Sequence, residues 1–437
     1  MGTLRTKKLN NPDDRISQMP DEVLSFMLLL LLSEEEARTS ILSRRWRYVL
    51  NTSAAYSSSL NLDVVAMRGS PYSVSSTDLL LIEQLKFIKW VDQILQLDYR
   101  PTMDSFRLRF CFNKDSADHI NRWINMAISK SMKYFDIDLS HFHNLGYCLP
   151  NEEFYTFPDW LFTCETGSLV KLLCLKACIF RPLDFKFSSL IDLQLDHVLI
   201  DQDCFVNFLS SCPNLEKLCL IFRIYKIDAR NLNRLEYRGY PVHFTFLNVP
   251  QLSNIIVYFA HGESISADVT RVFYSFSSQL PKLDSLMMHG FLIKKPILPS
   301  LVKSYIIPLL HGSPYLHTLE LHWCFPSVNG EGDTMQKPFD SPHCYLKNIT
   351  VSGFRGSAHE IEFTTYLLHN AKTLETFSIF KAKKHYSYER GYFSFDGGEI
   401  EMEEVARKQL INVLPLVLLN FRCCSFYLYS SFSRTTF

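Results

Sequence analysis

The chain has 437 residues, 47% of them hydrophobic, so it can bury a large apolar interior and we expect it to be folded throughout. Lysine plus arginine number 45 and aspartate plus glutamate number 45, which gives a formal net charge of zero. This balance excludes a chain-wide field that would attract nucleic acid or an acidic membrane surface. Any partner is therefore expected to be selected by local surfaces.

The N-terminal segment does not resemble a secretory signal. Residues 1–11 carry charges and lack the apolar stretch of about 7 or more residues that such a signal needs. The most apolar early run, Phe26 to Leu32, is much shorter than the roughly 20 residues needed to cross a bilayer. We expect an intracellular protein of the nucleus or cytoplasm, with no membrane span.

Motifs for catalysis, cofactors and metals are absent from the sequence. There is no Gly-x-Gly-x-x-Gly, phosphate loop, His-Glu-x-x-His or Gly-x-Ser-x-Gly pattern. The 12 cysteines include no Cys-x-x-Cys pair, and Cys174 and Cys178 have no second pair at a zinc-site spacing. His317, His322 and Cys324 cluster without a carboxylate partner at a recognisable spacing and are interpreted as strand-face and turn residues. The sequence predicts a non-catalytic protein without a metal or cofactor.

Three short helices are predicted near the N-terminus. Pro20 suits a first helical position, Asp21 and Glu22 favour the positive end of the helix dipole, and an apolar stripe follows. Ser33 and Glu36 form a capping box that begins a second helix, and a third covers about residues 44–49. A unit of about 40 residues is too small to cover all of its apolar faces, so it needs a partner surface.

The segments from Asp14 to Leu24 (DRISQMPDEVL) and from Ala37 to Arg47 (ARTSILSRRWR) resemble the F-box of the large plant F-box family. The resemblance implies that this unit binds a Skp-type adaptor and, through it, a cullin scaffold. It further implies that the family's adaptor contacts are made here by Pro20, Leu24, Ile41, Leu42 and Trp46. For each of these residues, the alternative is packing within the three-helix unit.

One turn departs from the family pattern. Leu31 and Leu32 stand where Leu-Pro is usual, and Glu34, Glu35 and Glu36 stand where a lysine is common. Loss of the turn proline and added negative charge predict weaker adaptor binding.

A repeated hexad, with apolar residues at positions 1, 4 and 6, follows a serine-rich loop or linker from Ser53 to Ser76. In the hexad that begins at Leu190, alternation predicts a strand with Leu193 and Leu195 on one face and Gln194 on the other. The segment from Asp203 to Ser211 has the spacing of a helix packed behind the sheet. Hexads recur every 27 residues or so on average, a typical repeat length, and begin at Met103, Met132, Val170, Leu190, Leu215, Leu232, Leu252, Leu283, Leu316, Leu346 and Leu374.

This pattern resembles the irregular leucine-rich repeats of plant F-box proteins, most clearly from Val170 to Phe222, where Cys178 and Val198 take the ninth position. The resemblance implies an α/β solenoid, a parallel-stranded horseshoe whose concave face recognises a partner. The alternative for any single residue is a solvated sheet face. The candidate substrate-binding residues are the polar positions beside the apolar ones: Arg107, Arg109, Asp136, Asp138, Asp192, Asp196, Arg234, Glu236, Arg238, Tyr258, His289, Glu320 and His322.

The segments 344–347, 353–356, 360–363 and 366–375 resemble the FBD domain that ends many plant F-box repeat proteins. Their pattern predicts strand, amphipathic helix and strand, which would cap the solenoid. From about Leu414 the sequence departs from that family, with Cys423 and Cys424 in an irregular apolar tail. We expect the last strand of the domain to be lost there.

The predicted order is an F-box (12–55), a linker and solenoid start (56–100), leucine-rich repeats (101–335), an FBD-like domain (340–412) and a divergent tail (413–437). It indicates the substrate-recognition subunit of a Skp-cullin-F-box E3 ubiquitin ligase, acting on an unknown protein. One alternative is a non-degradative interaction scaffold or decayed family member. Another is a horseshoe that holds a small-molecule signal, for which the sequence shows no basic pocket.

Overall fold

The computed structural model describes these residues of the chain: 19–21, 23–24, 45, 59–68, 77–98, 101–140, 153–157, 169–182, 187–221, 226–240, 242–259, 272, 274–292, 307–324, 342–353, 358–380, 384–387, 392–395 and 419–421. They fall into two compact units, residues 1–155 and 156–437, which are considered separately. No helix among the described residues is both long enough and apolar enough to span a membrane.

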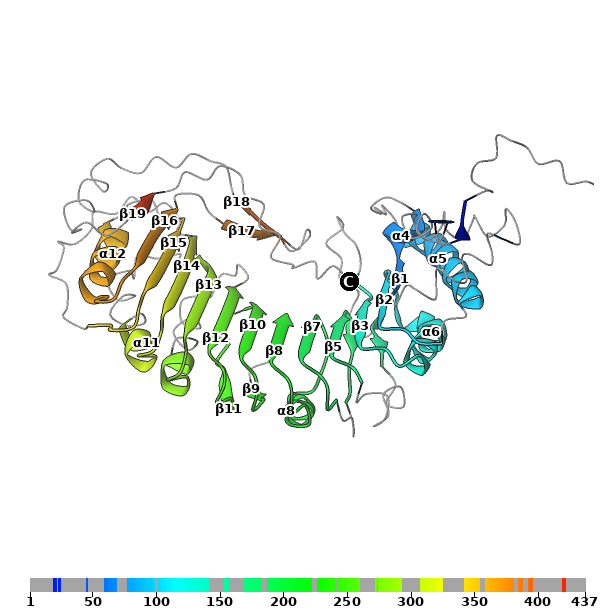
Figure 1. The fold of residues 1–437 in the computed structure, drawn as a ribbon, viewed down its shortest axis with the longest axis horizontal. Helices are drawn as coiled ribbons and strands as arrows, with labels where there is room; N and C mark the ends of the chain where they lie inside the picture. The colour runs from blue at the N-terminus through cyan, green and yellow to red at the C-terminus, as the bar shows by residue number, and fades with distance from the viewer. Residues whose placement is uncertain are drawn as a thin grey trace, which may run out of the picture. The chain divides into compact units, whose positions relative to one another are not determined.

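The described part of the first unit contains parallel strands in the order β1 (Ser59–Asp63), β2 (Ser105–Arg109) and β3 (Tyr134–Asp138). Its helices are α4 (Val64–Arg68), α5 (Thr77–Leu97), the short 3₁₀ helix η2 (Lys114–Ser116) and α6 (Ala117–Ser129) (Figure 1). Alternate strand residues are buried, as the hexad pattern requires. The short strand β4 (Tyr155–Thr156) lies at the boundary of the two units.

Aromatic side chains join α5 and α6 in the core of this unit. The rings of Phe87 and Phe110 stack with centroids 4.5 Å apart, and Phe112 lies 5.8 Å from Trp123. The indole Nε1 of Trp123 donates a 2.8 Å hydrogen bond to Asp92 of α5. The two helices are therefore held by apolar packing and by a charge-assisted hydrogen bond.

Replacing Trp123 by phenylalanine is expected to lower the free energy of unfolding by about 1–2 kcal/mol. The phenyl ring keeps most of the packing, whereas Asp92 loses the indole donor. Urea unfolding followed by circular dichroism measures the change. The double variant Trp123→Phe/Asp92→Ala should lose less than the sum of the two single losses, and full additivity would contradict coupling through this bond.

The second unit is built on a parallel sheet. Its strands follow the order β5 (Leu172–Lys176), β7 (Asp192–Asp196), β8 (Lys217–Ile221), β10 (Arg234–Gly239), β12 (Asn254–Phe259), β13 (Ser285–Leu292), β14 (Thr318–Cys324), β15 (Asn348–Ser352), β16 (Thr376–Phe380) and β19 (Leu419–Phe421). Within this unit the strands follow an arc, with α8 (Gln202–Ser210), α11 (Ile307–Gly312) and α12 (Ala358–Asn370) on its outer side (Figure 1). The predicted α/β repeat architecture is confirmed.

Shorter strands accompany this sheet: β6 (Cys178–Ile179), a parallel pair of β9 (Lys226–Asp228) with β11 (Thr245–Asn248), and an antiparallel pair of β17 (Lys384–Ser387) with β18 (Tyr392–Phe395). Helix α8 shows why the outer layer forms. The carboxylate of Asp201 caps it by accepting hydrogen bonds from the backbone amides of Asp203 and Cys204. On its inner face, Phe208 makes edge contacts with Phe180 and Phe187. The helix predicted over 203–211 thus begins one residue earlier, at Gln202.

Two strands end in a left-handed residue at the eighth position of the repeat. Ala177 has φ of 53° and His197 has φ of 51°, and the amide of each donates to the next strand, Ala177 to Asp196 and His197 to Ile221. This conformation costs a residue with a Cβ about 1 kcal/mol or more. The interstrand hydrogen bonds hold the backbone there.

Replacing Ala177 by valine is expected to destabilise the protein by about 1–2 kcal/mol, because a β-branched side chain is strained at positive φ. Ala177→Gly should change stability by less than about 1 kcal/mol, since glycine adopts this conformation freely. Chemical denaturation of the three proteins compares them. Equal losses for valine and glycine would show that the backbone conformation is not the cause.

Two expectations from the sequence were wrong. The serine-rich segment predicted as a loop contains β1 and α4, because Leu60 and Leu62 alternate as in the other hexads although Ser57 occupies position 1. The last strand of the C-terminal region is not lost: β19 pairs in parallel with β16 and supplies hydrogen bonds to an otherwise open sheet edge. Most of the predicted F-box helices lie outside the described residues.

Candidate recognition surface on the repeat sheet

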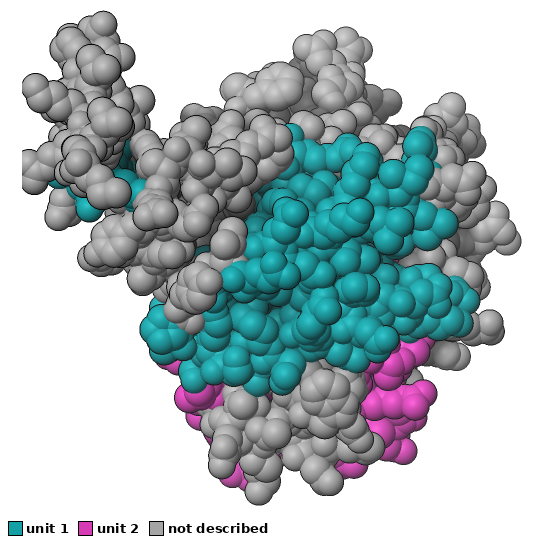
Figure 2. Space-filling model, turned by 90° about the vertical axis from the view of Figure 1, so that its right-hand side faces the viewer, with its two compact units in different colours: residues 1–155 teal, residues 156–437 magenta. Residues whose placement is uncertain are grey.

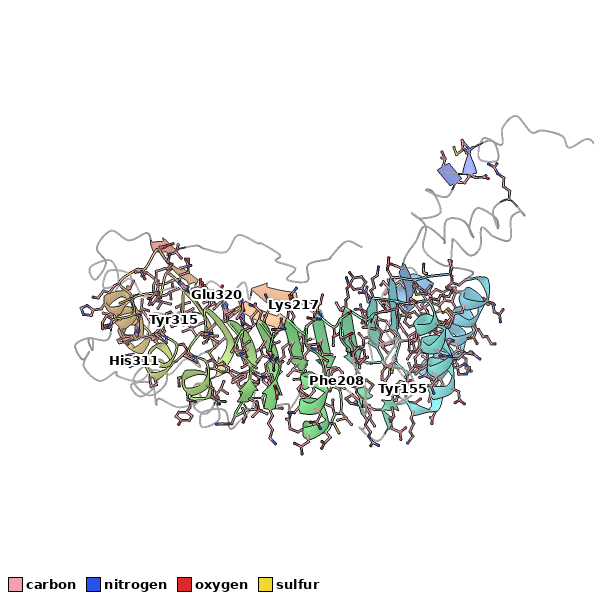
Figure 3. All side chains as sticks on the ribbon, turned by 60° about the horizontal axis from the view of Figure 1, so that its bottom comes forward. Tyr155, Phe208, Lys217, His311, Tyr315 and Glu320 are labelled. Carbon is pink, nitrogen blue, oxygen red and sulfur yellow. The ribbon has the colours of Figure 1, made fainter. Side chains whose placement is uncertain are left out.

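The strand register aligns equivalent hexad positions of successive repeats. Positions 3, 5 and 7 alternate with the buried positions 4 and 6, so their side chains form the sheet face opposite the helices, here called the open face. In Figure 3, Lys217 and Glu320 are labelled on the sheet and Phe208 on α8. Position 7 runs through directly paired residues: Lys176, Asp196, Ile221, Arg238, Tyr258, His289, His322 and Ser352.

Four of these position-7 residues form a continuous stack. The guanidinium carbon of Arg238 lies 5.0 Å from the ring centroid of Tyr258. The rings of Tyr258 and His289 stack with centroids 4.8 Å apart, and those of His289 and His322 lie 3.8 Å apart at an interplanar angle of 14°. Each of the four residues is at most 7% exposed. We call Arg238, Tyr258, His289 and His322 the position-7 stack.

Carboxylates from position 5 lie beside both ends of the stack. Arg238 donates from Nε to Oε1 of Glu236 at 2.8 Å, and its terminal nitrogen contacts the same oxygen. At the other end, Glu320 Oε2 lies 3.4 Å from His322 Nε2. His322 Nδ1 also forms a hydrogen bond with the hydroxyl of Ser352. The stack is therefore held by cation–π attraction, ring stacking and local charge pairing.

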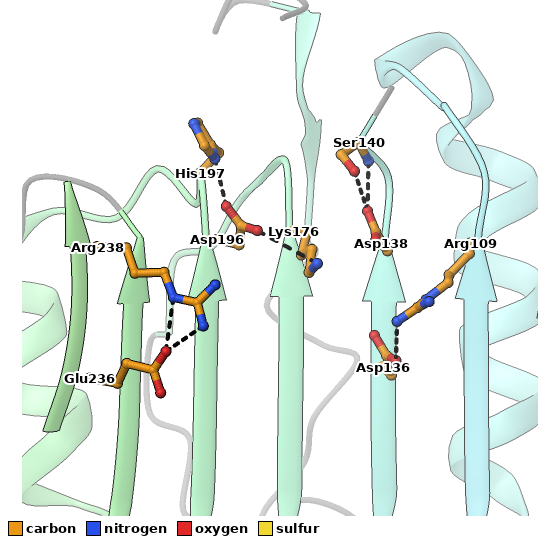
Figure 4. A network of polar contacts seen from close by, with 9 residues as sticks. All are labelled: Arg109, Asp136, Asp138, Ser140, Lys176, Asp196, His197, Glu236 and Arg238. Carbon is orange, nitrogen blue, oxygen red and sulfur yellow. Dashed lines mark hydrogen bonds and ion pairs between the residues drawn. The ribbon is translucent and has the colours of Figure 1, made fainter. Parts of the chain in front are cut away.

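Asp196 is the centre of a second polar cluster, on β7. Its carboxylate lies 2.6 Å from His197 Nδ1 and 3.6 Å from Lys176 Nζ (Figure 4). Burial opposes ionisation of Asp196, but the hydrogen bond with His197 and the charge of Lys176 leave its pKa below the ordinary value. The same hydrogen bond raises the pKa of His197. The site favours a charged, preformed pair over free ions.

Asp192 differs from Asp196 in its surroundings. Burial is the main cause that raises its pKa, and Glu236 on β10 adds to the rise, while Gln194 and Lys217 act against it. Asp192 accepts a 3.2 Å hydrogen bond from the amide of Gln194. This part of the open face therefore carries acidic groups that are partly desolvated.

The first unit has its own pairs at equivalent positions. Asp136 Oδ2 accepts from Arg107 Nε at 2.7 Å and lies 3.4 Å from Arg109. Asp138 accepts a 3.1 Å hydrogen bond from the backbone amide of Ser140 and another from its hydroxyl (Figure 4). The candidate basic and acidic residues of these strands contact one another.

The structure places the candidate substrate-binding residues at positions 3, 5 and 7 of their repeats, and it pairs many of them with each other. These contacts are short ion pairs between neighbouring side chains, together with the buried position-7 stack. The candidate set missed Lys176, Lys217, Ile256 and Met287, which occupy the same positions of other repeats. A candidate set that included every residue at hexad positions 3, 5 and 7, whatever its type, would have contained them.

His317 and His322 do not share a site, and the side chain of Cys324 lies outside the described part of the structure. His317 stands at position 2 and pairs with Asp284 at 2.5 Å, whereas His322 belongs to the position-7 stack. Within the described ranges, no group of three or more histidine, cysteine or acidic side chains could hold a metal ion.

The described F-box residues are few. Pro20 is exposed, whereas Leu24 is fully buried. Arg45 donates from Nε to Asp21 at 2.8 Å and also contacts the carbonyl of Met19, which ties distant parts of the segment together. Of the predicted adaptor contacts, Ile41, Leu42 and Trp46 lie outside the described residues.

Comparison with known proteins agrees with the architecture. A family model described as "At1g61320/AtMIF1, LRR domain" matches residues 94–224, and the FBD model matches residues 341–379. The FBD-associated F-box protein At5g56370 of Arabidopsis thaliana is 32% identical over 84% of this chain and 90% of its own length. The chain belongs to the plant F-box/FBD/LRR-repeat family. The F-box/FBD/LRR-repeat protein At3g52680 of the same plant is 26% identical over 84% of this chain and 85% of its own length.

The FBD match covers the end of the solenoid, where β15, α12 and β16 give the predicted strand, helix and strand. His343, beside α12, is buried, and its Nε2 lies 2.9 Å from the hydroxyl of Tyr366. Its backbone amide donates to Asn370, and Lys372 donates to its carbonyl. Burial, with a smaller effect of His311, lowers the pKa of His343 to about 4.

Proposed function

We propose that this family member is the substrate-recognition subunit of a Skp-cullin-F-box E3 ubiquitin ligase, and that it is itself non-catalytic. The observation that carries the proposal is the order of its parts: an F-box sequence, a repeat sheet and an FBD segment, in a chain whose relatives over 84% of its length are named F-box/FBD/LRR-repeat proteins. Such a receptor would act by holding a protein substrate near the charged conjugating enzyme, which raises its effective concentration.

The F-box (12–55) is proposed to bind the Skp-type adaptor, and through it the cullin, in the nucleus or cytoplasm. Proposed contacts are Pro20, Leu24, Ile41, Leu42 and Trp46. The exposure of Pro20 supports a docking role for it, while the burial of Leu24 favours a role in supporting the F-box from inside. The residue type of Trp46 also supports a docking role, because tryptophan is enriched in interface hot spots.

The open face of the repeats (101–335) is proposed to bind the substrate protein, with the FBD-like domain (340–412) capping the solenoid and the tail (413–437) beyond it. The proposed contacts are Arg107, Arg109, Asp192, Asp196, Arg234, Glu236 and Glu320, whereas Arg238, Tyr258, His289 and His322, each at most 7% exposed, are proposed to hold this surface in place from beneath. Pre-paired charges and locked rings support this role, because a rigid surface loses little conformational entropy on binding.

A pull-down of the full chain with Skp-type adaptors tests the proposal. The wild-type protein should bind, and Trp46→Ala and Pro20→Ala should each weaken binding by about tenfold or more. Gln96→Ala, on the exposed polar half of α5, is the matched control and should bind normally. Failure of a well-folded wild-type chain to bind any adaptor would overturn the ligase proposal.

A non-degradative scaffold is the second candidate. The observation that favours it is the turn at Leu31 and Leu32, which lacks the family proline and is followed by Glu34, Glu35 and Glu36. On this proposal the repeats bind their partner while the adaptor does not bind at all, so the same pull-down separates the two functions.

A further inference from the structure

Helix α5 carries apolar side chains on two opposite sides. Its inner side faces the core of the first unit, where Phe87 and Val91 are fully buried. On the opposite side, Leu81, Ile82 and Leu85 are 58%, 49% and 60% exposed. Residues spaced three and four apart share a helix face, so these three form one apolar stripe. An exposed apolar stripe on a helix whose other side is already buried marks a surface for a further contact.

Basic side chains follow this apolar stripe in the C-terminal direction of α5. Lys89 follows Leu85 by four positions, and Lys86 follows Ile82 by four, so both lie on the same outer side. Both are exposed, and Lys86 also pairs with Glu83 at 2.8 Å. Further along the helix the outer residues Gln93 and Gln96 are polar and exposed. Helix α5 belongs to the first unit, whose described surface is teal in Figure 2. The outer face of α5 is thus apolar first and basic next, here called the α5 face.

We infer that the α5 face is the docking surface for a segment of the same chain, residues 26–36 of the F-box. That segment has the complementary order: seven apolar residues from Phe26 to Leu32, then Ser33 and the three glutamates 34–36. In this arrangement the apolar stripe of α5 packs against the apolar run of the segment, and Lys86 and Lys89 pair with the glutamates of the acidic turn. The glutamates that depart from the F-box family pattern have a role in this arrangement, because they pair with lysines of this chain.

Chain length supports an intramolecular contact. The predicted F-box ends at residue 55, and β1 begins at Ser59, so only residues 56–58 connect them. An extended link of this length spans about 14 Å. Beyond β1, α4 contacts both β1 and α5, and Arg68 of α4 lies 2.6 Å from Glu83 of α5. The F-box is thereby tethered at the side of the unit to which α5 belongs, which gives it a high effective concentration at the α5 face.

This contact restricts the motion of the F-box. Docking on α5 fixes the orientation of the F-box relative to the first strands of the repeat sheet, instead of leaving it on a free linker. This inference does not depend on adaptor binding and would hold equally for a scaffold protein.

Hydrogen exchange of the full chain, measured by mass spectrometry on peptides that cover residues 26–36, tests the inference. Leu81→Ser/Leu85→Ser should speed exchange in these peptides by about tenfold or more. Gln93→Ser/Gln96→Ser, on the same helix beyond the stripe, should leave it unchanged. Lys86→Glu/Lys89→Glu should also speed exchange, and adding Glu34→Lys/Glu35→Lys/Glu36→Lys to that variant should restore protection.

Three results would overturn the inference. Unchanged exchange in the Leu81→Ser/Leu85→Ser protein would show that the α5 face does not hold this segment. A wild-type dimer in sedimentation velocity that becomes monomeric in that variant would identify a second copy as the occupant. Protection of residues 26–36 that arises only after a Skp-type adaptor is added would show that the adaptor, and not the α5 face, covers this segment.

Discussion

Replacing Glu236 by alanine is expected to lower the free energy of unfolding by about 3 kcal/mol, because the buried Arg238 loses the carboxylate that neutralises it. The Arg238 side chain is 9% exposed and Glu236 is 17% exposed, so water compensates poorly for the loss. The guanidinium also lies over Tyr258, and its displacement would loosen the position-7 stack. Urea unfolding measures the loss of stability.

The double variant Glu236→Ala/Arg238→Met should be more stable than Glu236→Ala alone, because it removes the buried cation together with its partner. The matched control is Glu320→Ala at the same hexad position of β14, where the carboxylate is 29% exposed and its partner is a histidine. Its expected loss is below about 1 kcal/mol. Equal losses for Glu236→Ala and Glu320→Ala would refute a special role for the buried arginine pair.

The repeat sheet could be predicted from the sequence because one local pattern determines it. Leucines at hexad positions 4 and 6, such as Leu193 and Leu195, must be buried on one side, and a shift of one residue would expose them. The register observed between β7 and β8 follows from this rule, since Leu193 pairs with Leu218 and Leu195 with Leu220. The hexads predict which side chains share the open face.

The ion pairs and ring contacts among those side chains could not be predicted from the sequence. Glu236 and Arg238 lie two apart on one strand, and the sequence leaves open whether they pair together or with residues of neighbouring strands. The stacking of His289 on His322 needs both rings in particular rotamers, which local propensity does not specify. The strand β1 was missed for a different reason, because a serine replaced the leucine at position 1 and hid the alternation of Leu60 and Leu62.

The α5 face shows the limit of a composition-based reading. Helix periodicity assigns one apolar side to the core, but α5 carries leucines on the outer side too, and only the exposed fractions of Leu81 and Leu85 show that the described part of the chain leaves them open. An apolar side of this kind can be identified as a candidate contact surface only when the structure shows which side of the helix is already buried.

Acidification from about pH 7 to pH 5 is expected to lower the stability of the wild-type protein by about 2 kcal/mol through His343 alone. The unfolded chain binds a proton there with the ordinary pKa of 6.5, and the folded chain does so only at about 4. Between these values the unfolded state holds more protons, so stability falls as the pH falls from 6.5 towards 4. Above 6.5 both states are neutral and His343 contributes no pH dependence.

His343→Gln isolates this effect. Glutamine does not titrate and retains a polar group that can reach the hydroxyl of Tyr366, so the variant should lose about 1 kcal/mol at neutral pH and show a shallower decline below it. His369→Gln, on the last turn of α12, is the matched control, and its decline should follow the wild type. Denaturant melts at several pH values give each slope.

The reason for this pH dependence lies in the packing of the FBD segment. His343 is 8% exposed, and its ring lies 5.8 Å from that of His311, so a proton there would place a charge in a desolvated site beside another titratable ring. The backbone of His343 is also hydrogen-bonded to both Asn370 and Lys372, which holds this residue against the end of α12, and its ring contacts the hydroxyl of Tyr366. If the His343→Gln slope equals that of the wild type, the ring must leave its site at little cost, and the FBD end of the solenoid is less firmly packed than these contacts imply.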